Sequence, residues 1–449
     1  MSDPNEVTIL ASDHVVLPAG VRPAAIRIAG GRIAAILDLA DPQARGASML
    51  DGQWLLPGLV DTHVHINDPG RAEWEGFATA TRAALAGGVT TLVDMPLNAI
   101  PATNDVAALH AKRAATPGHL YADVAFWGGL VPGNALALEA LAAAGVRGFK
   151  CFLSPSGVAE FGHVSRSDLE LAAPVLARLG LPLLVHAEDP ARLLEMRGDP
   201  RQYKSWLASR PVEAEVSACR MLAGLSREHL LWIHVVHVAC GEAALVLLQA
   251  RAAGARITFE TCPHYLCFEG ETIPAGSTIH KCAPPIREAA QREALWARVL
   301  DGSFDVVASD HSPCPPALKR LESGDFSAAW GGIASLELGL SALWTEGERC
   351  GLTCERLVAL MAAGPARLSG LQGRKGAITV GADADLVAFD PQTRWRVDAA
   401  LLHQRHAVTP YAGRPMQGRV VSTWLRGERV WHEGAFAPPR GHMIPAPVE

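Results

Sequence analysis

The chain of 449 residues is 49% hydrophobic, which allows a large core in two or three domains, or in one large barrel with an accessory domain. Its formal net charge is -6 without a basic block, which argues against a protein that binds nucleic acid or an anionic membrane. The sequence opens without a leader pattern and has no run long enough to cross a bilayer. With nine cysteines that lack CxxC spacing, we expect a cytoplasmic protein with free thiols.

Both ends of the chain have the composition of β-structure. Residues 7–37 and 376–430 are rich in Val, Ile, Gly and Asp-containing turns and show little helical periodicity. Neither end has enough strands for a stable sheet alone. We therefore expect the two ends to join in one small β-sandwich domain, formed by residues 1–54 and 371–449.

The middle of the chain alternates between short apolar or β-branched runs and Ala/Leu-rich stretches with helical periodicity. The helical stretches include residues 77–86, 135–144, 167–179 and 211–225. This alternation predicts an α/β fold, a (β/α)8 TIM-like barrel over residues 55–370. The eight candidate strands are residues 55–65, 89–95, 122–127, 146–152, 181–186, 231–238, 256–261 and 305–309.

Two histidines, His63 and His65, close the first candidate strand. Side chains alternate along a strand, so positions i and i+2 face the same way and can bind one metal ion together. In a chain with 17 histidines, a polar strand edge explains an isolated pair of this kind equally well. The ends of the other strands decide between the two interpretations.

Four more polar residues stand at or near the ends of candidate strands, where a barrel of this kind carries its chemistry. Lys150 belongs to the fourth strand, His186 ends the fifth, His237 lies near the end of the sixth, and Asp310 follows the eighth. Four histidines, one carboxylate and one lysine have the composition of a two-metal hydrolase centre, provided that the lysine supplies oxygen ligands.

Lys150 binds metal only after a chemical change, because an ammonium group has no lone pair. Burial beside Phe149 and Phe152 would favour the neutral amine, which reacts with carbon dioxide to give a carbamate with two oxygens. The alternative is an ammonium that reaches solvent or pairs with a carboxylate. The position of Lys150 among the other candidates favours the carbamate.

Two further choices concern the sixth and eighth strands. Strand alternation places His234 and His237 on opposite faces, so we expect His237, nearer the strand end, to be the ligand and His234 to be structural. Asp310 has an alternative role as a turn or helix-capping residue. Its place after the eighth strand favours a metal ligand that also carries protons and is therefore the catalytic residue.

These residues lie within longer stretches that resemble the cyclic amidohydrolases of the amidohydrolase superfamily, which include dihydroorotase, hydantoinase and allantoinase. The resemblance covers essentially the whole chain and is greatest to the allantoinase family. The stretches are residues 61–71, 73–77, 94–98, 148–153, 281–287, 309–314 and 329–333.

The resemblance implies a metal site shared by six residues. His63, His65 and Asp310 would bind one divalent ion, His186 and His237 the other, and carbamylated Lys150 would bridge both together with a hydroxide. Zinc is the default metal, with cobalt, manganese or iron as alternatives. All six positions are filled, which argues against a non-catalytic scaffold relative that has lost its ligands.

Further expectations concern the surroundings of this site. By resemblance, Asn98, the Cys282 backbone and Ser312 would contact the substrate, although turn formation explains the same three residues. His264, His311 and Glu188 would support the metal ligands rather than bind metal. Members of the family are commonly homotetramers, so a homo-oligomer is expected.

The substrate implied by the resemblance is allantoin, whose hydantoin ring amide would be hydrolysed to allantoate in purine catabolism. Dihydroorotases typically place an arginine two residues after the second histidine to bind a carboxylate. Here the residue is Asn67, whose amide suits carboxylate-free allantoin better, although Arg71 lies nearby. Hydantoinases typically have a tyrosine soon after the bridging lysine, where residues 154–157 read Ser-Pro-Ser-Gly. Hydantoinase, dihydropyrimidinase and dihydroorotase remain the alternatives.

Overall fold

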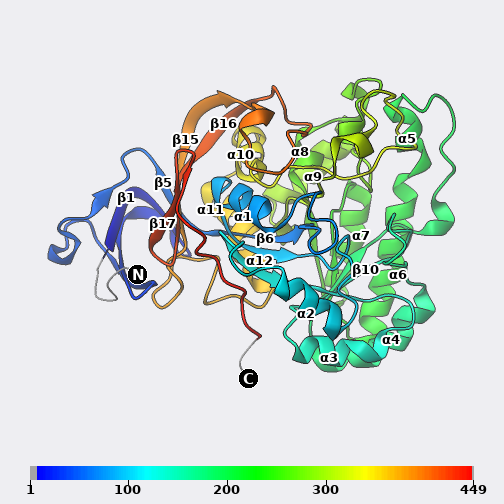
Figure 1. The fold of residues 1–449 in the computed structure, drawn as a ribbon, viewed down its shortest axis with the longest axis horizontal. Coiled ribbons are helices and arrows are strands. Elements are labelled where there is room, and N and C mark those ends of the chain that lie inside the picture. The colour runs from blue at the N-terminus through cyan, green and yellow to red at the C-terminus, as the bar shows by residue number, and fades with distance from the viewer. Residues whose placement is uncertain (1–7, 447–449) are drawn as a thin grey trace.

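A computed structural model describes residues 8–446 and shows a barrel beside a sheet that both ends of the chain build (Figure 1). The predicted fold, a (β/α)8 barrel with a β-sandwich from both ends, is confirmed. Val7, the first residue of the predicted β-region, and the opening residues that bear on a leader lie outside the described residues. Within the described range, no helix is both long and apolar enough to cross a membrane.

The described ends of the chain contribute nine strands to one continuous hydrogen-bonded sheet, in the order β18-β17-β16-β15-β5-β1-β2-β3, with β4 paired to β1. Strand β5 joins the two ends, since it pairs in parallel with β1 and antiparallel with β15. The strands are β1 (Thr8–Leu17), β2 (Gly20–Ala29), β3 (Arg32–Leu37), β4 (Ser48–Met49), β5 (Trp54–Pro57), β15 (Leu386–Arg396), β16 (Pro415–Leu425), β17 (Glu428–His432) and β18 (Ala435–Phe436).

The barrel strands run parallel and are almost entirely buried, as expected for a sheet covered on both faces. The barrel closes where its first strand meets the segment after its last strand. There Val64 pairs with His311, and the His65 N–H donates to the His311 carbonyl over 2.8 Å. The strands are β6 (Leu59–Val64), β7 (Val89–Asp94), β8 (Asp123–Phe126), β9 (Gly128–Gly129), β10 (Phe149–Phe152), β11 (Leu183–His186), β12 (Ile233–Val235), β13 (Ile257–Thr261) and β14 (Val306–Val307).

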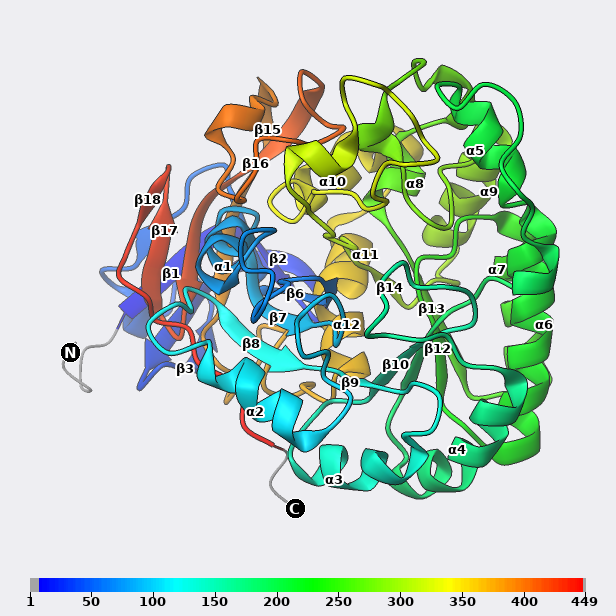
Figure 2. The same ribbon diagram turned by 45° about the vertical axis from the view of Figure 1, so that its right-hand side comes forward.

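Helices surround these strands, and Figure 2 shows α4, α6 and α7 outside β10 to β13. Local signals set their ends: Ser165 and Asp168 form a capping box at the start of α4, and left-handed Gly180 ends that helix. The helices are α1 (Phe77–Ala86), α2 (Val106–Ala114), α3 (Leu138–Ala143), α4 (Arg166–Leu179), α5 (Tyr203–Ser209), α6 (Val212–His229), α7 (Gly241–Ala252), α8 (Pro263–Cys267), α9 (Ala289–Leu300), α10 (Gly339–Cys350), α11 (Cys354–Val358) and α12 (Gly364–Leu368).

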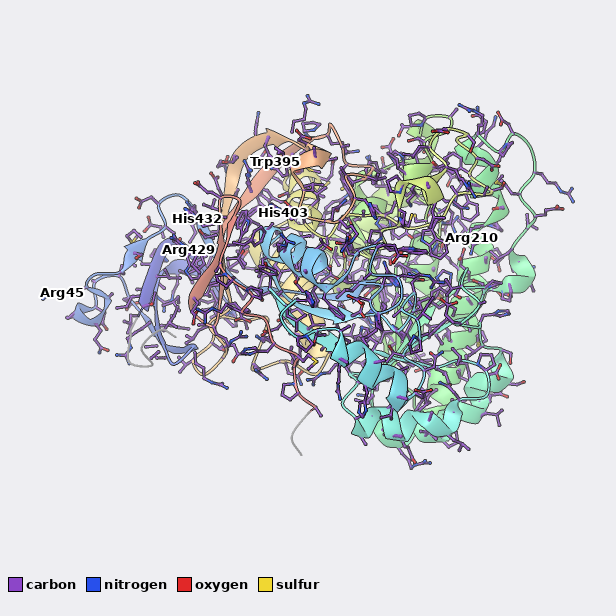
Figure 3. The ribbon with its side chains drawn as sticks, in the orientation of Figure 1. Arg45, Arg210, Trp395, His403, Arg429 and His432 are labelled. Carbon is purple, nitrogen blue, oxygen red and sulfur yellow. The ribbon has the colours of Figure 1, made fainter. Side chains whose placement is uncertain are left out.

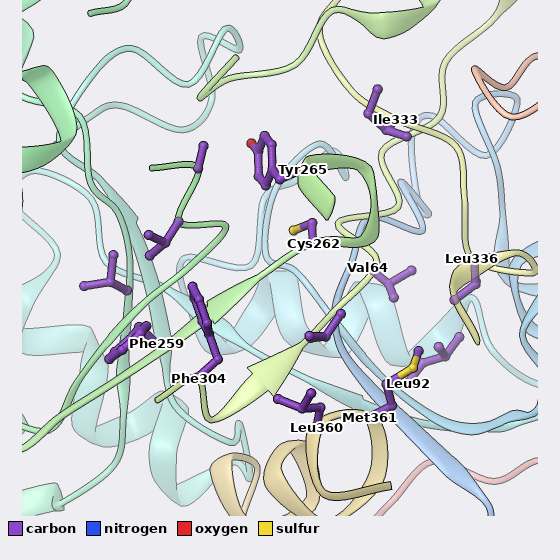
Figure 4. Packing of buried hydrophobic residues seen from close by; sticks show 14 of the residues in the cluster. Val64, Leu92, Phe259, Cys262, Tyr265, Phe304, Ile333, Leu336, Leu360 and Met361 are labelled. Carbon is purple, nitrogen blue, oxygen red and sulfur yellow. The ribbon is translucent and has the colours of Figure 1, made fainter. Parts of the chain in front are cut away.

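The main core fills the space between the barrel strands and the surrounding helices. Figure 4 shows one part of it, where Phe259 and Phe304 pack edge to face with their ring centroids 4.9 Å apart. Leu360 and Met361, from the helical segment between α11 and α12, lie in the same region. This packing fixes β13 and β14, from which part of the candidate site projects.

A buried ion cluster joins the terminal sheet to the barrel. The Lys375 ammonium lies 2.7 Å from an oxygen of Asp123, at the start of β8, and 3.0 and 2.5 Å from oxygens of Asp383 and Asp385. Arg426, after β16, adds a second cation 2.7 Å from Asp123. Burial alone would lower the pKa of Lys375, but the three carboxylates raise it, so the ammonium stays charged.

The first candidate strand, residues 55–65, is in fact two strands that belong to different sheets. Gly58 separates them: its N–H donates to Asp385 of the terminal sheet over 2.7 Å, and the next N–H, of Leu59, donates to Gly88 beside the barrel over 3.0 Å. A Cβ at Gly58 would lie 2.2 Å from Thr90 Oγ1 and 2.8 Å from Asp385 Cβ. The sequence prediction treated residues 55–65 as one strand, although Pro57 and Gly58 interrupt the run at the point where the partners change.

We expect the Gly58→Ala substitution to destabilise the protein by about 1–3 kcal/mol, because the added methyl group overpacks the junction between the two sheets. Thermal or urea unfolding measures this change. Gly224→Ala is the matched control, since a Cβ there meets only Glu228 Oε1, at 3.6 Å, inside α6. The control should be neutral or more stable, and equal stability of both variants would contradict the prediction.

Candidate functional site

Three of the predicted ligands converge where β6 meets the segment after β14. The Nε2 atoms of His63 and His65 lie 3.1 and 3.5 Å from the same oxygen of Asp310, and all three side chains are buried. Their ligand atoms lie within 4.8 Å of one another. Two imidazole nitrogens and one carboxylate oxygen at this spacing are a suitable donor set for a divalent ion.

A second pair of histidines faces the first group. His186 Nδ1 lies 3.0 Å from His237 Nε2, and the His237 ring centroid lies 5.4 Å from that of His63. Two nitrogens that bind one tetrahedral ion at the usual 2.0–2.1 Å are about 3.3 Å apart. The observed spacing therefore suits a shared ion, and Phe152 stacks on His186 at 4.6 Å to hold its ring in place.

Two of these residues have left-handed backbone conformations, which L-residues rarely adopt. His237 has φ 41° and Asp310 has φ 44°. Both lie beyond the strands that precede them, because β12 ends at Val235 and β14 at Val307. The turn at each residue aims its side chain at the site, at a cost in backbone strain that the surrounding packing sustains.

Lys150, in the middle of β10, is fully buried, and its Nζ has no hydrogen-bond partner among the described residues. Burial lowers its pKa to about 8, with Asp310 and Glu260 opposing the shift. A buried amine left without a partner is rare in folded proteins, because desolvation is costly without compensation. Burial thus increases the fraction of neutral amine, which is the form that reacts with carbon dioxide.

Asp310 stays ionised in this setting. Burial alone would raise its pKa, but the neighbouring His63, His65 and His237 outweigh burial and hold the pKa well below its usual range. The carboxylate is therefore available as an acceptor of hydrogen bonds or of a proton.

Glu260, from β13, supports the first histidine pair. Its carboxylate lies 2.5 Å from His63 Nδ1 and 3.1 Å from His234 Nε2, while His234 Nδ1 lies 2.9 Å from Thr258 Oγ1. These hydrogen bonds agree with the structural role expected for His234. The reason differs from the expected one: His237 lies beyond the end of β12, so the two histidines are not on opposite faces of one strand. Glu260 itself was missed, although a lone carboxylate within the β-branched and aromatic run of residues 257–261 was a signal.

The three residues that we expected to support the ligands differ in their contacts. Glu188 accepts from His186 Nε2 at 2.7 Å and also binds Arg210. His311 lies 3.3 Å from Glu75 and accepts the N–H of Ser335 at 3.1 Å. His264 lies near Asp310, but neither of its ring nitrogens has a partner within residues 8–446.

A cavity of about 310 Å³ opens onto four histidines and Asp310. Asn98, Cys282 and Ser312, the expected substrate contacts, all line it. The cavity wall also contains residues to which the sequence assigned no role: Trp206, Arg210, Lys281 and Trp330. Lys281 and Trp330 lie in the stretches that carry the resemblance, whereas Trp206 and Arg210 have no local sequence signal.

Arg71 lies close in sequence to Asn67, which stands where dihydroorotases have a carboxylate-binding arginine. The Arg71 side chain does not line this cavity. Its guanidinium pairs with Glu160 and donates to the Asn98 carbonyl over 2.7 Å. The Asn98 amide in turn donates to Asn67 Oδ1 over 3.1 Å. Arg71 therefore braces the segment that carries Asn98.

Comparisons with known proteins agree with this geometry. A model of the amidohydrolase family matches residues 54–430. The chain is 48% identical to an allantoinase of Streptomyces avermitilis over 97% of its own length and 98% of that protein, and 42% identical to an allantoinase of Arabidopsis thaliana over 96% and 91%. An L-hydantoinase (dihydropyrimidinase) from Arthrobacter aurescens has a similar structure, with a TM-score of 0.91, 31% identity, and coverage of 98% of this chain and 99% of that one.

We expect Glu260→Gln to weaken metal retention about 10- to 100-fold. The two carboxylate oxygens of Glu260 accept from His63 and His234, whereas a glutamine has only one accepting oxygen. Metal content after dialysis against graded chelator measures the effect. Glu242→Gln, on the exposed face of α7, is the control. Equal metal retention in the two variants would rule out the supporting role of Glu260.

Proposed function

Because the chain belongs to the amidohydrolase family, in the branch that contains the allantoinases, we propose that it hydrolyses the hydantoin ring of allantoin to give allantoate. The observation that carries this proposal is similarity to allantoinases over nearly the whole chain. The reaction would be a step of purine catabolism.

We further propose a binuclear metal centre with zinc as the default metal. His63, His65 and Asp310 would hold one ion, His186 and His237 the other, and a carbamate on Lys150 would bridge them. The unpartnered, buried Nζ of Lys150 supports the carbamate, and the two convergent donor groups support the ions. When bound, the ions would lower the pKa of water and polarise the ring carbonyl.

The residues of the chain would then manage binding and proton transfer. Asp310, ionised and buried beside His63 and His65, would accept a proton from the attacking water and deliver it to the departing ring nitrogen. Asn98, the Cys282 backbone and Ser312 would hold the ring and its arm.

Compartment and assembly belong to the same proposal. Nine unpaired cysteines, seven of them buried, suit a reducing, cytoplasmic compartment. We propose a homo-oligomer, with the tetramer of the family as the expected form.

Product formation by the purified chain, loaded with zinc and bicarbonate, tests the substrate. We expect the kcat/KM for allantoin to exceed those for hydantoin, dihydrouracil and dihydroorotate by about tenfold or more, because only allantoin carries the ureido arm and dihydroorotate carries a carboxylate that allantoin lacks. Preference for one of the other rings would assign the activity to a hydantoinase or a dihydroorotase. A chain without metal and without turnover would be a scaffold relative.

We expect Lys150→Ala to lower the metal content below two ions per chain and to remove turnover, because the bridging oxygens are lost. Added acetate or propionate should restore part of the activity by supplying a carboxylate. Metal analysis and allantoin turnover measure both effects, with Lys204→Ala, exposed on α5, as the control. Full activity of Lys150→Ala without added acid would contradict the proposal that Lys150 bridges the two ions.

A further inference from the structure

Arg210 is a cation in the cavity wall that neither the ligand set nor the proton transfer uses. It follows the last residue of α5 and lines the same cavity as His186, His237 and Asp310. Figure 3 labels it on the α5 side of the molecule, away from Trp395 and His432 of the terminal sheet. Its position next to the reaction site calls for a role.

One edge of the Arg210 guanidinium is already committed. Nε and Nη2 donate to the two oxygens of Glu188 over 2.9 and 2.5 Å, and Glu188 in turn accepts from His186. This bidentate pair fixes the plane of the guanidinium. Nη1 has no hydrogen-bond partner in residues 8–446, and the Arg210 side chain is 15% exposed whereas Glu188 is fully buried. Nη1 is therefore a donor whose orientation is fixed and which has no acceptor among the described residues.

Trp206 adds a flat apolar surface beside this donor. The Arg210 guanidinium carbon lies 5.1 Å from the centre of the Trp206 ring, and the Lys281 ammonium lies 4.4 Å from it. The indole N–H is occupied, because it donates to the Cys282 carbonyl over 3.1 Å. Lys281 is also occupied, since it donates to the Ala329 carbonyl over 2.6 Å. Trp206 thus lines the cavity with both cations against its ring, and Arg210 keeps the N–H groups of Nη1 free.

Lys281 is a further cation of this wall, but at the Arg210 guanidinium itself the charge balance favours a neutral ligand group. The Glu188 carboxylate compensates the Arg210 charge, so an anionic group here would meet a pair with no net charge. A planar amide or urea group, by contrast, has a carbonyl oxygen that accepts from Nη1 and a flat surface that packs on an indole. One bridging residue, Glu188, separates the guanidinium from the ligand His186, so a group bound there is close to the reacting carbon.

We propose that Arg210 and Trp206 form the subsite for the ureido arm of the substrate, with Nη1 donating to the carbonyl oxygen of the arm. This inference rests on the proposed function, because the arm distinguishes allantoin from unsubstituted hydantoin. The arm sits on the ring carbon next to the carbonyl that is attacked. Recognition of the arm at this subsite therefore orients the scissile amide over the candidate metal centre.

The test separates the arm contact from the support that Arg210 gives to Glu188. Arg210→Gln disturbs Glu188 and His186 for every substrate, but it removes the arm contact only for ligands that carry the arm. We expect kcat/KM for allantoin to fall about 10- to 100-fold more than kcat/KM for hydantoin, mainly through KM. Arg192→Gln, which alters an exposed arginine outside the cavity, should change neither value.

Binding of the two products gives a readout that does not depend on turnover. Allantoate carries two ureido groups, one from the opened ring and one from the arm, whereas N-carbamoylglycine, the product from hydantoin, carries only one and cannot fill both positions. By calorimetry on the metal-loaded protein, the wild type should bind allantoate more tightly, and Arg210→Gln should remove most of that difference. Equal weakening of both products, or no weakening of either, would overturn the subsite. If the wild type hydrolyses another ring but not allantoin, the proposed function itself fails.

Discussion

Polar groups taken into the interior of a barrel must be compensated there, because water cannot reach them, and this requirement organises the molecule. The Glu260 carboxylate contacts His63 and His234, and the Glu188 carboxylate contacts His186 and Arg210. Three carboxylates surround Lys375 at the junction of the sheets. Against this background, Lys150 is an exception of its kind: of the buried side-chain atoms without a partner in the described residues, its Nζ is the only ammonium nitrogen. The exception coincides with the point on which two groups of candidate metal ligands converge, so we expect a group from outside the chain to compensate it.

The same requirement explains why the supporting residues come from different strands. Asp61, in β6, accepts the N–H of His63 and the N–H of Ser309, and so ties the first strand of the barrel to the segment that carries Asp310. Glu260 joins β13 to β6 in a similar way. Each buried carboxylate therefore holds two parts of the rim at once. The positions of the candidate ligands are a property of the closed barrel rather than of single strands.

The architecture and the main candidate residues could be predicted from the sequence because both follow from short-range patterns. Apolar runs of strand length, helical periodicity and polar residues at strand ends gave the barrel and placed His186 and Asp310 near the cavity. What could not be predicted depends on contacts between distant segments. The change of sheet at Gly58 rests on Thr90 and Asp385, and the roles of Trp206 and Arg210 rest on a fold that brings α5 to the cavity. The left-handed conformation of His237 likewise could not be predicted from the alternation of side chains along a strand.

Strand β5 has a consequence for the way the chain is made. Its two neighbours in the sheet, β1 and β15, come from opposite ends of the sequence, and the whole barrel lies between β5 and β15. During synthesis, β5 therefore emerges from the ribosome long before its second neighbour exists, with one edge open to wrong partners. The barrel strands follow directly and can assemble first. The pairing of β15 with β5 therefore has to wait until the whole barrel between them has been translated.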